Sequence, residues 1–351
     1  MSDRERGRGK LPWAWVAAGC LTALAVVLTI ATGSASAASV GNGIVAHERS
    51  ATGSGGSPRW TPSQMRHAVP LELLREEPSA NADAYPARGG SDGGPGYVDG
   101  RPPVGAGLAA PSASAETAGL GRFTSEPVSD PNVYPNTTNG KVFGRITKVG
   151  SYSCSAAVVH ARNRSVIFTA GHCVKEPGRG GWAKDLTFVP SYDRGAEPFG
   201  QWTWDVIYTK KAWAKRGNTN FDYSAVVLRR SDGRLAEDTV GSLGFAFNVP
   251  KRQTYRPVGY PFNKFDSEVM WECTSGYGGP DPFYRKPGPP PIGIGCDMLG
   301  GASGGGWSIA GNRLASVTSF GYDNRPNELY GPKLTKKANK MRLKAGREAV
   351  G

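Results

Sequence analysis

The sequence predicts an all-β fold, either an antiparallel sandwich or a pair of barrels, over residues 131–351. In this part of the chain short apolar runs such as "SAAVVHA", "SVIFTAG" and "YSAVVLRR" alternate with turns. Runs rich in Val, Ile, Thr and aromatic residues, separated by Gly, Pro, Asn and Asp, are typical of such folds. Only residues 333–348 repeat apolar side chains at helical spacing, which predicts a short C-terminal helix.

The first 37 residues predict export. Basic residues at the start precede an apolar run from Leu11 to Ile30, and Ala35-Ser36-Ala37 offers a cleavage site for a signal peptide. The apolar run also approaches the roughly 20 residues that span a bilayer, so an uncleaved membrane anchor is the alternative. We therefore expect a secreted protein, which contacts a membrane only if this segment is not cleaved.

Residues 38–130 read as a disordered pro-region or linker. The segment is loaded with Gly, Ser, Ala and Pro, as in "GGSDGGPGYVDGRPPVGAG". Such a composition buries too little apolar surface to offset the entropy of ordering. Within it, the apolar residues between Pro62 and Glu77 predict one helix of a propeptide.

The charge excess points to no specific partner. The formal net charge is +13, and the last 21 residues hold seven Lys or Arg against one Glu. A basic terminal helix is a candidate for binding nucleic acid or anionic polymers. Because aromatic residues do not interleave with these charges, we interpret them as a solvated face and expect no nucleic-acid partner. We also expect a monomer.

Four of the five cysteines lie in the β region, and Cys20 lies in the apolar run. In an exported chain an even number predicts disulfides. Three pairings of four thiols are possible, and sequence spacing favours the local ones, Cys154 with Cys173 and Cys273 with Cys296. A zinc site is the rival interpretation, although there is no C-x-x-C pair.

The residues also offer the parts of a nucleophilic site. A hydroxyl nucleophile needs a base, a group that orients the base, and donors for an oxyanion. Ser303 stands alone in the bare loop "GGASGGG", His172 follows an apolar strand beside a cysteine in "IFTAGHCV", and Asp222 leads into a buried strand in "NFDYSAVVL". His160, beside two arginines, reads as a surface residue. The other acids of this region lie in polar contexts typical of solvated turns: Asp185, Asp193, Asp205, Asp232 and Asp238.

"TAGHC", "FDYSAVVL" and "GGASGG", in the order His, Asp, Ser, resemble the chymotrypsin-like serine peptidases. "VGYP" and "CDMLGGASGGGW" are similar to the bacterial glutamyl-endopeptidase-like branch. The resemblance implies two antiparallel six-stranded β-barrels over residues 131–351. It also implies a catalytic triad of His172, Asp222 and Ser303, and an oxyanion hole formed by the backbone of Gly301 and Ser303. Finally, it implies a substrate-binding strand from Ser319 to Gly321 and no metal or organic cofactor.

One feature departs from the digestive members of the family, and two others bear on specificity. Ala302 stands where the digestive enzymes have an acid that pairs with a new N-terminus, so that activation switch is not available. Asp297 lies six residues before Ser303, where trypsin-like enzymes bind Arg or Lys, although an aspartate that fixes its own loop is an equal alternative. No histidine follows His172, which puts glutamate specificity in doubt.

The resulting hypothesis is a secreted, zymogen-forming serine endopeptidase that hydrolyses protein or peptide substrates through an acyl-enzyme. One alternative is an exported binding or adhesion module on the same scaffold without catalysis. The other is an esterase. The pattern G-x-S-x-G is present around Ser303, but an α/β-hydrolase would carry its histidine after the serine.

Overall fold

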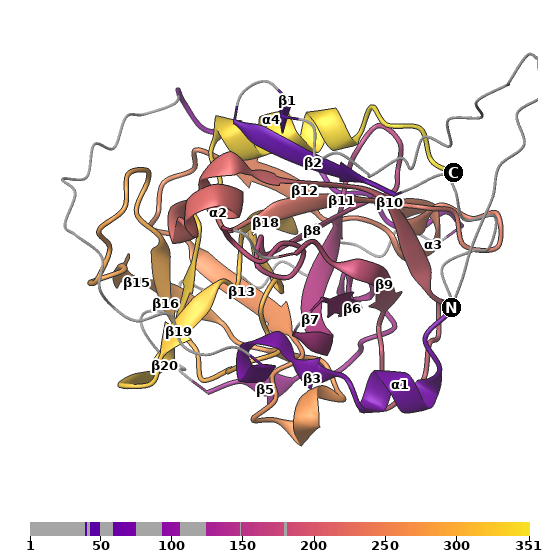
Figure 1. Cartoon of the computed structure of the whole chain (residues 1–351). Coiled ribbons are helices and arrows are strands. Elements are labelled where there is room, and N and C mark those ends of the chain that lie inside the picture. Colours follow the sequence, from indigo (N-terminus) through magenta and orange to yellow (C-terminus); the bar gives the residue numbers. More distant parts are fainter. Residues whose placement is uncertain are drawn as a thin grey trace, which may run out of the picture. The chain divides into compact units, whose positions relative to one another are not determined.

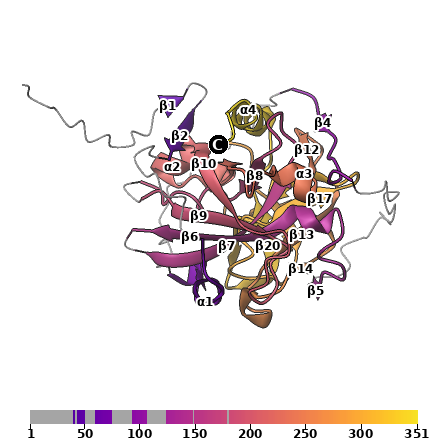
Figure 2. The ribbon, with the colours of Figure 1, turned by 90° about the vertical axis from the view of Figure 1, so that its right-hand side faces the viewer.

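Two sheets organise the described part of the chain in the computed structural model (Figure 1). The described residues are 39–40, 43–49, 59–74, 93–105, 124–147, 149–178 and 181–351. The predicted signal peptide lies outside these residues. Figure 2 shows β6, β9 and β10 of the first sheet on one side and β12, β13 and β14 of the second on the other. No helix among the described residues is long and apolar enough to cross a membrane.

The first sheet contains a closed six-stranded barrel, as the resemblance implies. Its strands, in the order in which they pair, are β6 (Asn139–Ile146), β7 (Gly150–Val159), β8 (Val166–Thr169), β11 (Ser224–Leu228), β10 (Trp202–Lys210) and β9 (Lys184–Pro190). In β7, Cys154, Ala156 and Val158 face the barrel core, whereas Ala157 and Val159 belong to a second cluster. Both faces of the strand are therefore buried, which explains the unbroken apolar run "SAAVV".

In the described part of the chain the second sheet does not close into a barrel, so the expectation of two six-stranded barrels is wrong for this half of the fold. Its ordered path is β19 (Phe320–Tyr322), β20 (Arg325–Gly331), β16 (Ile292–Gly295), β15 (Ser275–Pro280), β13 (Thr254–Gly259), β17 (Gly306–Ile309), β18 (Arg313–Val317), β12 (Gly244–Phe247) and β4 (Gly96–Val98). After β18 the chain turns into the β19–β20 hairpin, which pairs with β16 instead of β18. Just after β18, the Ser319 N–H donates to the Tyr330 carbonyl at 2.9 Å, so the chain already pairs with β20 at this point. Two short strands pair beside β13: β14 (Trp271–Glu272) and β5 (Glu126–Pro127).

The expectation that residues 38–130 are disordered is wrong for several parts of this segment. In addition to β4 and β5, the ordered parts are β1 (Ser39–Val40), β2 (Ile44–Glu48), α1 (Pro62–Arg66), β3 (Val69–Pro70) and the 3₁₀ turn η1 (Leu71–Leu74). Strand β2 pairs with β10, and β3 pairs with β7. Trp60, Met65 and Leu71 are at most 5% exposed. The segment orders because it buries these side chains against the barrel and extends existing sheet edges.

The predicted helix between Pro62 and Glu77 is also shorter than expected. It begins with a capping box, in which Thr61 and Gln64 each accept from the other's backbone, and ends at Arg66. Pro70 lies in β3, where it has no N–H to donate. The apolar residues after Arg66 are therefore buried as a strand and a 3₁₀ turn.

The C-terminal helix is confirmed as α4 (Lys336–Ala345). The Thr335 hydroxyl caps its first turn, and Ala338, Met341 and Ala345 are buried. These side chains belong to the cluster that covers the outer face of the barrel. The remaining short helical segments are η2 (Asn136–Thr138), α2 (Lys211–Arg216), η3 (Thr219–Phe221), α3 (Ala236–Val240) and η4 (Phe265–Ser267).

Candidate active site

His172 is held in a turn directly after β8. The disulfide between Cys154 and Cys173 ties this turn to β7. The imidazole packs edge-on against Trp213, with ring centroids 6.1 Å apart, and the residue is 3% exposed. A disulfide on one side and an indole on the other fix a titratable ring in one orientation, as a base requires.

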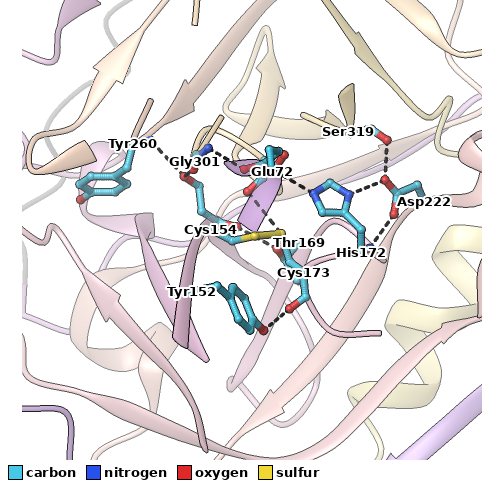
Figure 3. The surroundings of a disulfide bond; sticks show 12 residues. Glu72, Tyr152, Cys154, Thr169, His172, Cys173, Asp222, Tyr260, Gly301 and Ser319 are labelled. Carbon is cyan, nitrogen blue, oxygen red and sulfur yellow. Dashed lines mark hydrogen bonds and ion pairs between the residues drawn. A yellow bond between two sulfur atoms is a disulfide. The ribbon is translucent and has the colours of Figure 1, made fainter. Parts of the chain in front are cut away.

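Asp222 orients this ring, and Figure 3 shows its carboxylate between His172 and Ser319. Asp222 Oδ2 lies 2.7 Å from His172 Nδ1, and Oδ1 accepts the His172 backbone N–H at 2.7 Å. The Ser319 hydroxyl donates to Oδ2 at 2.5 Å. A Cβ at Gly171 would lie 2.8 Å from Oδ1, so the glycine of "TAGHC" lets the carboxylate reach this backbone. Because Asp222 binds Nδ1, the Nε2 atom is left to face the site.

Ser303 lies in the glycine-rich loop between β16 and β17, and β7 fixes this loop. The Ser303 carbonyl accepts the Ser155 N–H at 2.7 Å, and the Ser155 hydroxyl donates to the Gly301 carbonyl at 2.8 Å. Gly301 has φ +91°, and a Cβ there would lie 2.5 Å from the Tyr260 carbonyl oxygen. Only glycine fits this position, which sets the direction of the Gly301 N–H.

A carboxylate that the sequence analysis missed lies at the centre of the site. Glu72, in η1, places Oε1 at 3.3 Å from His172 Nε2 (Figure 3). Its Oε2 accepts the Gly301 N–H at 2.9 Å. Burial alone would raise the pKa of Glu72, but the hydrogen bond and charge of His172, together with Ser303, lower it to about 2. Glu72 is therefore ionised at neutral pH.

The structure places the expected substrate-binding residues in different settings. Asp297 accepts the Ser125 backbone N–H at 2.8 Å and pairs with the Lys264 ammonium at 2.9 Å. Burial opposes ionisation there, but these two contacts lower the pKa of Asp297. Ser319 contacts Asp222, as described above. Gly321 is exposed on β19, an edge strand of the second sheet.

The remaining candidates have structural partners. His160 Nδ1 lies 2.9 Å from the Glu237 carboxylate. The other acids considered from the sequence each pair with an arginine, in the pairs Arg145–Asp185, Arg194–Asp193, Arg229–Asp205, Arg59–Asp232 and Arg164–Asp238. Asp193 and Asp232 lie in turns, as expected, but Asp185 and Asp205 lie in strands β9 and β10 and Asp238 lies in helix α3, so the expectation of a solvated turn is wrong for these three.

The cysteines form the two local pairs that the spacing favours, Cys154–Cys173 and Cys273–Cys296. Among the described residues, side chains that could hold a metal ion gather in two places. One group is the Cys154–Cys173 pair with His172, and the other is the Cys273–Cys296 pair with Asp297. Sulfurs bonded to each other are not thiolates, so these groups do not offer the ligands of the zinc site considered from the sequence.

No protein-family model matches the chain. Two curated proteins with similar sequences are both proteases. An extracellular metalloprotease of Bacillus subtilis is 32% identical over 144 residues, which are 40% of this chain and 40% of that protein. A glutamyl endopeptidase of Bacillus licheniformis is 29% identical over 108 residues, which are 30% of this chain and 32% of that protein. The matches thus span less than half the length of these curated relatives.

A solved structure is matched over nearly its whole length. It is a thermostable serine protease from an extremophilic microorganism, 32% identical, with a TM-score of 0.57. The match covers 61% of this chain and 98% of that one. With this identity, this coverage and the shared fold, the chain belongs to the chymotrypsin-like serine proteases.

Proposed function

We propose that the chain is a secreted serine endopeptidase in which Ser303 is the nucleophile, His172 the general base and Asp222 the group that orients the base. One observation carries this proposal. The Glu72 carboxylate lies 3.3 Å from the His172 Nε2 and accepts the Gly301 N–H at 2.9 Å, and the Ser303 side chain is among the groups that lower its pKa. A base and an oxyanion donor that converge on one small group, next to a serine in a bare loop, support acyl transfer as the reaction.

In this mechanism His172 Nε2 takes the proton of the Ser303 hydroxyl as the oxygen attacks a peptide carbonyl. The Asp222 carboxylate stabilises the imidazolium that forms, and the Gly301 and Ser303 amides bind the oxyanion. His172 then protonates the leaving amine. A water molecule, deprotonated by His172, hydrolyses the acyl-enzyme and restores the Ser303 hydroxyl.

The edge strand β19 supports a role in holding the substrate. Strand β19 pairs with β20 along one edge and ends the order of the second sheet. An extended peptide adds to such an edge through backbone hydrogen bonds. Gly321 leaves room for it, whereas Ser319 acts through Asp222. The Lys264 partner of Asp297 counts against direct recognition of a basic substrate side chain by that acid.

A serine-directed fluorophosphonate probe tests the assignment on the full chain with prolonged incubation. We expect covalent labelling at Ser303, none in Ser303→Ala, and a rate at least about a thousandfold lower in His172→Ala. Ser308→Ala, a substitution of a buried serine on β17, is the matched control and keeps its label. Labelling that persists in Ser303→Ala would contradict the assignment, and so would a failure of both the folded full chain and its Glu72→Ala variant to react.

A further inference from the structure

The group at the centre of the candidate site belongs to the chain itself. Glu72 comes from the segment 59–74, and its carboxylate reaches the site across a sequence separation of 229 residues from Gly301. Its two oxygens divide between the His172 ring and the Gly301 N–H. In the proposed reaction, His172 would protonate the leaving group and the Gly301 N–H would bind the oxyanion. The two Glu72 oxygens therefore occupy the places of these two substrate atoms.

We propose that residues 59–74 are a tethered inhibitor, with the Glu72 carboxylate as its blocking group, which keeps the full chain inactive until the segment leaves the site. The inference rests on the proposed function, because it needs Ser303 to be the nucleophile. A carboxylate suits the task chemically. It is anionic like the oxyanion, so it binds the same donor, but its carbon is a poor electrophile and gives Ser303 no bond to cleave.

Several buried contacts keep the segment in place. The Trp60 backbone exchanges two hydrogen bonds with the Gln201 side chain, at 3.0 and 2.7 Å, and its indole N–H donates to the Asp185 carbonyl at 2.9 Å. Met65 and Leu71 are both 0% exposed. Leu71 belongs to the barrel core, so the residue before Glu72 is anchored in the part of the molecule that carries His172.

The backbone just before Glu72 is also held by the barrel. Val69 and Pro70 pair in parallel with Tyr152 and Ser153 of β7. On the other side of the contact, a Cβ at Gly300 would lie 3.4 Å from the Glu72 Cβ, so Glu72 lies within van der Waals reach of the glycine-rich loop. Because the segment is covalently attached, its effective concentration at the site exceeds that of most free substrates.

This device also accounts for Ala302. The acid that pairs with a new N-terminus in the digestive enzymes is missing from this position, so control of activity must come from another contact. In our proposal the Glu72 carboxylate blocks an active site that is already formed. In the digestive enzymes, by contrast, the new N-terminus is needed to form the site.

The test compares rates of fluorophosphonate labelling for the full chain, Glu72→Ala, Glu72→Gln and the control Leu73→Ala. Leu73 is the neighbour of Glu72 and is 54% exposed. We expect Glu72→Ala to react at least about tenfold faster than the unmodified chain, since a hydrogen-bonded charge is lost. Glu72→Gln, which keeps the shape without the charge, should show a smaller increase, and Leu73→Ala should stay within about twofold.

Acetate provides a rescue of the missing carboxylate. Sodium acetate should slow labelling of Glu72→Ala in proportion to its occupancy, while sodium chloride at the same ionic strength should not. If Glu72→Ala reacts no faster than Leu73→Ala, the inhibitory role is overturned.

A second readout does not depend on reactivity. In a Ser303→Ala background, amide hydrogen exchange of residues 69–74 should increase on Glu72→Ala and not on Leu73→Ala. Suppose that exchange increases on Glu72→Ala but that none of the chains with Ser303 intact is labelled. This outcome would support the Glu72 contact and contradict the proposed nucleophile. Unchanged exchange in Glu72→Ala would overturn the contact as the anchor of this segment.

Discussion

At the scale of single residues, Glu72 gives the docked segment a defined pH dependence. The pKa of Glu72 is lowered from 4.5 to about 2 in the folded chain, so folding favours the ionised form. A carboxyl group with a lowered pKa contributes stability above its unfolded value, and this stability is lost as the pH falls through the folded value. The contribution is thus complete above about pH 5 and disappears toward pH 2.

We therefore expect Glu72→Gln to destabilise the Ser303→Ala chain by about 1–2 kcal/mol at pH 5, and by progressively less below pH 4.5. Thermal unfolding followed by circular dichroism at a series of pH values measures the difference between the two chains. A difference that stays constant from pH 5 to pH 2 would show that the Glu72 carboxylate is not paired with His172 in solution.

The same scale shows what sequence could and could not predict of the site. His172, Asp222 and Ser303 each lie in a local pattern: a ring beside a cysteine, an acid before a buried strand, a hydroxyl in a bare loop. Glu72 has no such pattern, because its role comes from a contact between segments far apart in the chain. Its one local signal is its place between leucines in "PLELL", where a charged side chain is unexpected.

At the scale of elements, the two disulfides should affect the site differently. They close loops of similar length, with sequence separations of 19 and 23, so each should stabilise the chain by roughly 3 kcal/mol. Only Cys154–Cys173 fixes the turn that carries His172. We expect Cys154→Ala/Cys173→Ala to lower the labelling rate at least about tenfold, because misplacing a base is costly.

The pair Cys273→Ala/Cys296→Ala is the matched control for this prediction. It should lower the melting temperature by a similar amount and change the labelling rate by less than about threefold. Equal losses of labelling in the two double variants would mean that the first disulfide supports the site only through overall stability.

The elements that sequence predicted best are those whose patterns are local. The long barrel strands and helix α4 follow from apolar runs and from helical spacing. Strands β2 and β3 were missed because they are short and order only by pairing with β10 and β7. Closure of the second sheet was expected from the family resemblance. Such closure depends on pairing between distant strands, which no local pattern determines.

At the scale of the molecule, one hydrophobic cluster joins the N-terminal segment to both sheets. Trp60, Met65 and Ala68 pack in it with Phe143 of β6 and Val258 of β13. Each of these five side chains is at most 7% exposed. The segment thus shares a core with the two sheets, and its stability is coupled to theirs.

This coupling predicts a single cooperative unfolding transition for residues 59–74 and the two sheets. Met65→Ala should destabilise the Ser303→Ala chain by about 2–5 kcal/mol, through lost burial and a residual cavity. The melting temperature should fall by about 2–4 °C for each kcal/mol, whereas Leu73→Ala should change the stability by less than about 0.5 kcal/mol. Differential scanning calorimetry measures both effects. A separate low-temperature transition in Met65→Ala, with the main transition unmoved, would contradict the shared core, since it would mean that the segment detaches while the sheets keep their full stability.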